Sequence, residues 1–176
     1  MKKTVALLLG LALCLGAFSA GAEEIKIGGL TLDVPEEYAV FLSEKDESTV
    51  LTLQKGDVVY SITSGKKQVP ELELILIYRT VEDGFYSAID PAYTPAGEET
   101  LFIGQTEVHL SSATVKAAGQ EAQVMCLCML IDGDLTVISV MPLDGSAPDR
   151  AAIEEMLTFI KKPKFFRKGL TEEPVK

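Results

Sequence analysis

Two cysteines and two methionines alternate in the segment Met125-Cys126-Leu127-Cys128-Met129, inside an apolar run that predicts a buried strand. On a strand, side chains two residues apart share a face. Cys126 and Cys128 should therefore point one way, and the two methionines the other. Two thiolates on one face could bind a soft ion such as Cu(I) or Zn(II). The sequence thus gives Cys126 and Cys128 as candidate metal ligands.

A structural interpretation of the same cysteines stands beside the metal one. Free cysteines are usually small, buried hydrophobic residues. A disulfide between Cys126 and Cys128 is disfavoured, because on an extended strand their Cα atoms lie near the limit of bridging distance and their Cβ vectors are parallel. Thiols that survive in an oxidising compartment would also need burial.

His109 is the only histidine of the chain, and it alternates with Val108 and Leu110 in a predicted strand. No serine, cysteine or acid stands with it in a recognisable catalytic motif. We therefore expect His109 on the solvent face of its strand. An enzyme with a site that the sequence does not signal, using His109 or a pair of carboxylates, remains an alternative.

Acidic residues occur in adjacent pairs, for example Glu98-Glu99 and Glu154-Glu155. Adjacent strand residues face opposite ways, so we expect a solvated surface and not acid/base dyads. Residues 132–134, Asp-Gly-Asp, lack the remaining ligands of a calcium loop and are assigned to a turn. Hydrolase, metalloprotease, phosphate-loop and dinucleotide motifs are absent from the sequence. We therefore predict no catalytic residue and no cofactor, and expect a protein that is not an enzyme.

A basic and aromatic segment follows the last predicted helix of this acidic protein. It could contact an anionic lipid surface or an acidic partner. Alternatively, it is a cationic helix end followed by phenylalanines that pack back on the domain. The residues of this contact hypothesis are Lys161, Lys162, Lys164, Phe165, Phe166, Arg167 and Lys168.

The first 22 residues have the pattern of a secretory signal peptide. Lys2 and Lys3 precede an apolar run over residues 4–18, and Ala20 and Ala22 supply small residues for cleavage near Ala22. The run is shorter than the ~20 residues of a bilayer span, so we expect no transmembrane segment in the mature chain. The expected location is extracytoplasmic, either periplasmic or secreted. The net charge of −10 argues against nucleic acid as a partner.

The remaining pattern predicts an α+β fold, with an antiparallel sheet built from hairpins and a C-terminal amphipathic helix packed on it. Ser146 and Pro148 begin that helix, and Pro163 ends it. We expect one domain over residues 23–162, then a mobile, basic-then-acidic tail over 163–176. The expected segments are hairpins 25–27/30–32, 49–53/58–63 and 123–131/135–141, a strand or buried helix segment at 72–80, a short helix at 82–89, a loop at 91–97 and strand residues at 106–110 and 112–117.

Three segments in this order resemble the PsbP-like group of small proteins, which includes DcrB-type exported bacterial proteins. They are LDVPEEY at 32–38, IDGD at 131–134 and DRAAIEEMLTFIK at 149–161. The resemblance covers about residues 25–162 and implies an antiparallel sheet flanked by helices. It implies no shared activity and carries over no site residue.

The sequence as a whole favours an exported, soluble, non-catalytic binding or accessory domain. Its partner would be an envelope or extracellular protein or a small ligand. The alternatives are soft-metal binding through Cys126 and Cys128, and an enzyme with an unsignalled site.

Overall fold

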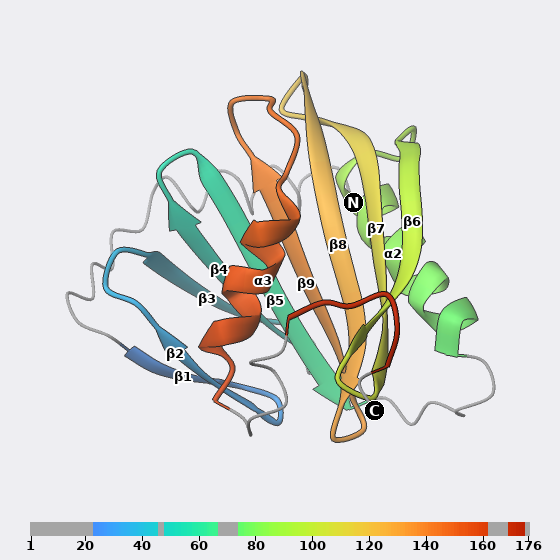
Figure 1. The fold of residues 1–176 in the computed structure, drawn as a ribbon. Coiled ribbons are helices and arrows are strands. Elements are labelled where there is room, and N and C mark those ends of the chain that lie inside the picture. Colours follow the sequence, from blue (N-terminus) through green and yellow to red (C-terminus); the bar gives the residue numbers. More distant parts are fainter. Residues whose placement is uncertain (1–22, 46–47, 67–73, 162–168, 175–176) are drawn as a thin grey trace.

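The computed structural model describes residues 23–45, 48–66, 74–161 and 169–174. These residues form an α+β fold with two antiparallel sheets and two helices, as the sequence predicts (Figure 1). Strands β1 (Glu23–Ile27) and β2 (Leu30–Val34) pair as a separate hairpin. The larger sheet has seven strands in the order β3-β4-β5-β9-β8-β7-β6. Its strands are β3 (Ala39–Lys45), β4 (Ser48–Lys55), β5 (Val58–Lys66), β6 (Thr94–Ile103), β7 (Thr106–Ala117), β8 (Gln120–Ile131) and β9 (Asp134–Pro142).

The predicted hairpins are confirmed, and their turns explain them. Gly28 has φ +55°, a conformation that costs glycine little. Asp132 and Gly133 have φ of 50° and 84°, the positive values that a two-residue hairpin turn requires at both central positions. The β8–β9 pair therefore turns tightly, with Ile131 opposite Asp134.

Asp134, the residue after that turn, also contacts the β1–β2 hairpin. Its Oδ2 accepts a hydrogen bond of 3.0 Å from the backbone N–H of Gly29, and the residue is buried. A Cβ at position 29 would lie 2.7 Å from the same oxygen, so only glycine allows this close approach. The contact joins the β1–β2 hairpin to the larger sheet.

The larger sheet is covered on both faces (Figure 1). Helix α3 (Arg150–Phe159) and the β1–β2 hairpin lie on one face, and helix α2 (Leu74–Ile89) lies on the other. Strand β8 contributes side chains to the cores on both faces of the sheet, because successive side chains of a strand point to opposite faces. Leu127 and Met129 belong to the core beneath α3, whereas Cys126 and Cys128 belong to the core beneath α2. The predicted mid-sheet position of this strand and the opposite faces of its cysteines and methionines are confirmed.

Helix α2 corrects the prediction for residues 72–89. The apolar run at 72–80 favoured a strand followed by a short helix, but residues 74–89 form one helix. Tyr78, Glu82 and Tyr86 are its buried residues, and their spacing of four places them on one helical face. The strand prediction was wrong because an apolar run without period-two alternation does not distinguish a strand from a buried helix.

Strand β6 occupies residues 94–97 of the loop expected at residues 91–97, whereas residues 91–93 lie outside any strand or helix, as expected. It begins at Thr94 and contains Pro95 and Gly97, the residues on which the loop prediction depends. The strand lies at the edge of the sheet, where a proline removes no ladder hydrogen bond from a second neighbour. The pairing with β7 also shifts register between Pro95 and Gly97, which fits a bulge at that point.

The predicted C-terminal helix is present, with a later start. Asp149 is its N-cap and accepts a hydrogen bond from the Ala151 N–H, so the N-cap lies three residues after Ser146. After it, Thr171 pairs with Phe102 of β6, and Leu170 is buried. Residues 170 and 171 of the expected tail therefore contact the sheet or its core. The division into a domain of residues 23–162 and a tail remains a prediction.

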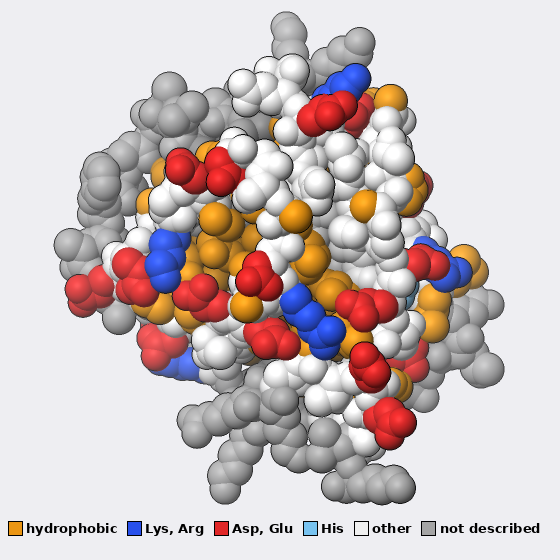
Figure 2. Space-filling model, turned by 45° about the horizontal axis from the view of Figure 1, so that its top comes forward, with side chains coloured by type: hydrophobic (Ala, Val, Ile, Leu, Met, Phe, Trp, Pro, Cys, Tyr) orange, Lys and Arg blue, Asp and Glu red, His pale blue; other side chains and the backbone are white. Residues whose placement is uncertain are grey.

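Acidic side chains dominate the charged surface in Figure 2, with a few basic side chains between them and apolar ones near the centre of the view. This distribution agrees with the net charge of −10. Within the described ranges, no helix has the length and apolar character needed to cross a bilayer.

Candidate metal site

The α2 face of the sheet brings together chemically active side chains from three elements. Helix α2 packs on β7 and β8 and directs Glu82 and Tyr86 toward them. In the register of those strands, His109 lies opposite Cys128, and Ser111 lies opposite Cys126. Residues at paired positions share a face, so both cysteines, His109 and Ser111 all face α2.

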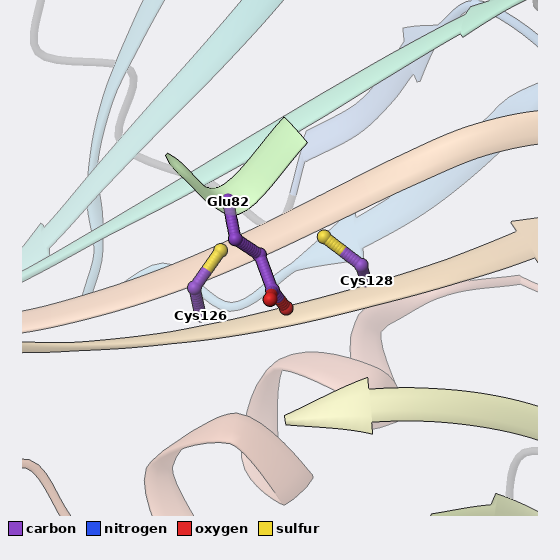
Figure 3. A group of neighbouring side chains, drawn as sticks. All are labelled: Glu82, Cys126 and Cys128. Carbon is purple, nitrogen blue, oxygen red and sulfur yellow. The ribbon is translucent and has the colours of Figure 1, made fainter. Parts of the chain in front are cut away.

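Glu82, Cys126 and Cys128 form a compact cluster (Figure 3). One carboxylate oxygen and the two Sγ atoms all lie within 4.8 Å of one another. Both cysteines are free and have no exposed surface, and Glu82 is 3% exposed. Among the described residues, Glu82 Oε1 has no hydrogen-bond partner. A buried carboxylate oxygen without a donor or cation is costly and is therefore uncommon in folded proteins.

His109 holds the other oxygen of Glu82. Its Nδ1 lies 2.8 Å from Glu82 Oε2, and the two side chains are 3% and 4% exposed. The expectation that His109 faces solvent is therefore wrong. The side chain points to the face of the sheet that α2 covers, and no local sequence pattern predicts that a helix covers this face.

A shallower ion pair continues this arrangement toward the surface. The Nε2 atom of His109 lies 3.7 Å from Glu98 Oε2, and Glu98 is exposed. Both Nε and a terminal nitrogen of Arg79 donate to the same carboxylate, the Nε bond being 3.0 Å. The polar side chains therefore run from the buried thiols to solvent in the order Glu82, His109, Glu98 and Arg79.

A pocket of about 520 Å³ opens beside these groups, between α2, β6 and β7. Tyr86 stands in its wall, with its hydroxyl 2.9 Å from Ser111 Oγ. Glu82 belongs both to the pocket lining and to the thiol cluster, so the pocket approaches the cluster from the solvent side. The lining residues are Arg79, Glu82, Asp83, Tyr86, Tyr93, Pro95, Ala96, Gly97, Glu98, Ser111 and Ser112.

The surroundings of Cys128 keep its thiol protonated. The pKa of Cys128 is raised far above its usual value by a hydrogen bond with Cys126, by burial and by nearby negative charge. Burial, with the neighbouring Cys128, raises the pKa of Tyr78 to about 12, and burial raises the pKa of Tyr86 further. The Cys128 thiolate is therefore unfavourable unless a cation accompanies it.

The two thiols should resist alkylation in the folded, metal-free protein. A thiolate is the reactive species, and neither sulfur is exposed. Iodoacetamide at pH 8 should label less than about a tenth of Cys126 and Cys128 in native protein and both completely in denaturant, with labelling followed by intact mass. Rapid labelling of the native protein would contradict the burial described here.

Among the other candidate residues within the described ranges, Glu98 is the one that lies near this site. Glu98 faces α2 and pairs with Arg79, whereas its neighbour Glu99 lies 3.8 Å from Arg150 of α3. The adjacent glutamates thus face opposite sides of the sheet. The Nζ atom of Lys161 lies 2.8 Å from Glu24 Oε2. Both residues are distant from the two cysteines in sequence. The rest of the contact hypothesis, Lys162, Lys164, Phe165, Phe166, Arg167 and Lys168, lies outside the described residues, as does the predicted signal peptide.

Glu82 is the functional candidate that sequence reasoning missed. The four-residue spacing of Tyr78, Glu82 and Tyr86 was available as a helical signal. A glutamate between two tyrosines on one helical face would then have stood out as a buried acid. Its pairing with His109 joins residues 27 apart in sequence, and no local pattern predicts such a pair.

No family model matches this chain, and no curated protein sequence matches it. The resemblance to the PsbP-like group therefore remains a prediction. Among solved structures, the chain is similar to LpqN, which is involved in cell envelope biogenesis in Mycobacterium tuberculosis. The identity is 12% and the TM-score 0.43, over 85% of this chain and 91% of that chain. Similarity at this level supports no conclusion about function.

Proposed function

We propose that the protein is an exported, non-catalytic binding domain whose ligand is a soft or borderline metal ion, Cu(I) or Zn(II), held by Cys126, Cys128 and Glu82. The observation that carries this proposal is the buried carboxylate of Glu82, which places one oxygen within 4.8 Å of both thiol sulfurs and whose Oε1 has no hydrogen-bond partner among the described residues. A metal ion at that point would pair with the orphaned oxygen and the two sulfurs together.

The surroundings of the cluster support a functional origin. Apolar side chains such as Val124 and Ala113 form the rest of this core. A buried hydrogen-bonded pair in such a core often stabilises a fold no better than apolar residues of the same shape would. The Glu82–His109 pair is therefore poorly explained by stability alone. Metal-binding carboxylates are commonly oriented by a hydrogen bond from a neighbouring side chain, which is the contact that His109 makes.

The test is a titration of the reduced protein with Zn(II) and Cu(I) against competing chelators. We expect one tightly bound ion for each chain and a loss of at least about 100-fold in affinity for Cys126→Ser/Cys128→Ser, because both sulfur ligands are removed. Equal affinity in the double variant and the wild type would refute the proposal.

A matched control lies on the same strand. Met125→Leu/Met129→Leu changes two sulfur-containing side chains on the opposite face, where Met129 packs in the α3 core. Leucine conserves their volume closely, so this variant should fold and bind metal as the wild type does. Loss of binding in both double variants would indicate a general effect on the strand and not on the ligands.

Export is proposed from the leader pattern of residues 1–22, and the PsbP-like resemblance is consistent with it. The mass of the protein recovered from outside the cytoplasm tests this, with Glu23 as the expected first residue. Catalysis by His109 has less support, because the residue is only 2% exposed and its ring nitrogens face Glu82 and Glu98.

A further inference from the structure

We infer that the site is built for Zn(II) and not for Cu(I), and that the carboxylate of Glu82 decides this choice. The inference rests on the proposed function and deepens it. Two thiols alone would suit either ion. The third donor of the cluster is a carboxylate oxygen, which changes the chemistry of the set.

The two ions differ in their preference for oxygen. Cu(I) is soft and favours thiolate and thioether ligands. Zn(II) is borderline and accepts carboxylate oxygen beside sulfur and nitrogen, in a tetrahedral arrangement. Met125 and Met129 could have supplied the thioethers that favour Cu(I), but they lie on the other face of β8, toward the α3 core. The donors that do face the thiols are therefore those that suit zinc.

Glu82 cannot readily leave the cluster. Its Oε2 is held by His109 at 2.8 Å, which leaves Oε1 free for the metal. The side chain projects between the two cysteines from a helix whose flanking Tyr78 and Tyr86 are also buried (Figure 3). Turning the carboxylate away would leave His109 without this partner in a buried position, which is unfavourable. His109 is thus a positioning residue for an oxygen ligand.

The separations in the cluster allow a zinc ion after small side-chain rotations. Zinc binds sulfur at about 2.3 Å and carboxylate oxygen at about 2.0 Å, so tetrahedral donors lie ~3.3–3.8 Å apart. The three donors are already within 4.8 Å of one another. Three protein ligands leave one tetrahedral position, which a water or a small molecule from the adjoining pocket would fill.

Charge supports the same choice. Two thiolates and one carboxylate carry three negative charges into a core that has no exposed surface at either cysteine. A divalent ion leaves one of these charges uncompensated within the ligand set, and a monovalent ion leaves two. Uncompensated charge is expensive in a buried site, so the donor set favours the divalent ion.

The test compares both ions in the reduced wild type and in Glu82→Gln, which keeps the shape of the side chain. We expect the variant to lose at least about 100-fold in affinity for Zn(II) and to change by less than about 3-fold for Cu(I), because only zinc uses the oxygen. The control is Glu98→Gln, an exposed neighbour of His109, which should leave both affinities unchanged.

Each result has a distinct meaning. Equal losses for the two ions, or no loss for zinc, would overturn the inference while leaving the thiol site in place. Wild-type protein that binds neither ion would overturn the proposed function itself. Should Glu82→Gln fail to fold, difference infrared spectra of the wild type replace it. Zinc should then shift the carboxylate stretching bands of one glutamate and Cu(I) should not, and a spectrum without that zinc shift would count against the inference.

Discussion

His109→Leu should lower the free energy of unfolding by about 1–3 kcal/mol in metal-free protein, the cost of leaving a buried hydrogen-bonding group without its partner. The replacement leaves Glu82, which is 3% exposed, without the 2.8 Å contact from His109 Nδ1. Domains of this kind are stable by only about 5–15 kcal/mol, so the loss should be plain in urea unfolding with reductant and chelator present.

The double variant Glu82→Leu/His109→Leu separates the polar contact of this pair from its packing. Leucine occupies a volume similar to either side chain, and the neighbouring core of Val124 and Ala113 is apolar. Its stability should lie within about 1 kcal/mol of the wild type or above it, while metal binding is lost. If the double variant were as unstable as His109→Leu, the pair would be a stabilising element of the fold, and the functional reason for its presence would fall away.

Leu127→Ala should cost about 3–5 kcal/mol, through a cavity on the opposite face of β8. Leu127 has no exposed surface and lies between Leu110 of β7 and Ile138 of β9, both of which are buried in the same core. The Leu127 side chain therefore has a buried neighbour on each adjacent strand. Because the sheet holds these neighbours in place, they can fill only part of the space that an alanine would leave. The measurement is the free energy of unfolding in urea.

Leu76→Ala is the matched control for that substitution. Leu76 lies on α2 and is 61% exposed, so the same chemical change removes little buried area there. Its effect should be within about 0.5 kcal/mol, since alanine is also a good helix former. Equal losses at the two positions would contradict the placement of the core beneath α3.

Short-range signals account for the parts of the fold that sequence predicts well. Gly28 and Asp132-Gly133 define their hairpins, because few residues adopt the positive φ angles that these turns need. The apolar stripe of the last helix predicts its position, although the N-cap proved to be Asp149. In each case the determining interaction lies within a few residues along the chain.

The candidate site depends on contacts that sequence does not reveal. Cys126 and Cys128 were identified from their spacing on one strand, and the structure places them on one face. Glu82 was missed because residues 72–80 favoured a strand, which hid the buried face of α2. His109 was expected in solvent because the helix that covers it comes from a distant part of the chain. Long-range packing thus decides burial, and burial decides the chemistry of both residues.

Strand β8 separates the two core layers of the domain, and its successive residues pack alternately in one layer and the other. Positions 126 and 128 belong to the layer under α2, and positions 127 and 129 to the layer under α3. The two layers have no core residue in common, so a substitution in one layer changes a different set of core residues from a substitution in the other. Ligand chemistry on one side can therefore diverge during evolution, one donor at a time, while the scaffold on the other side keeps its shape.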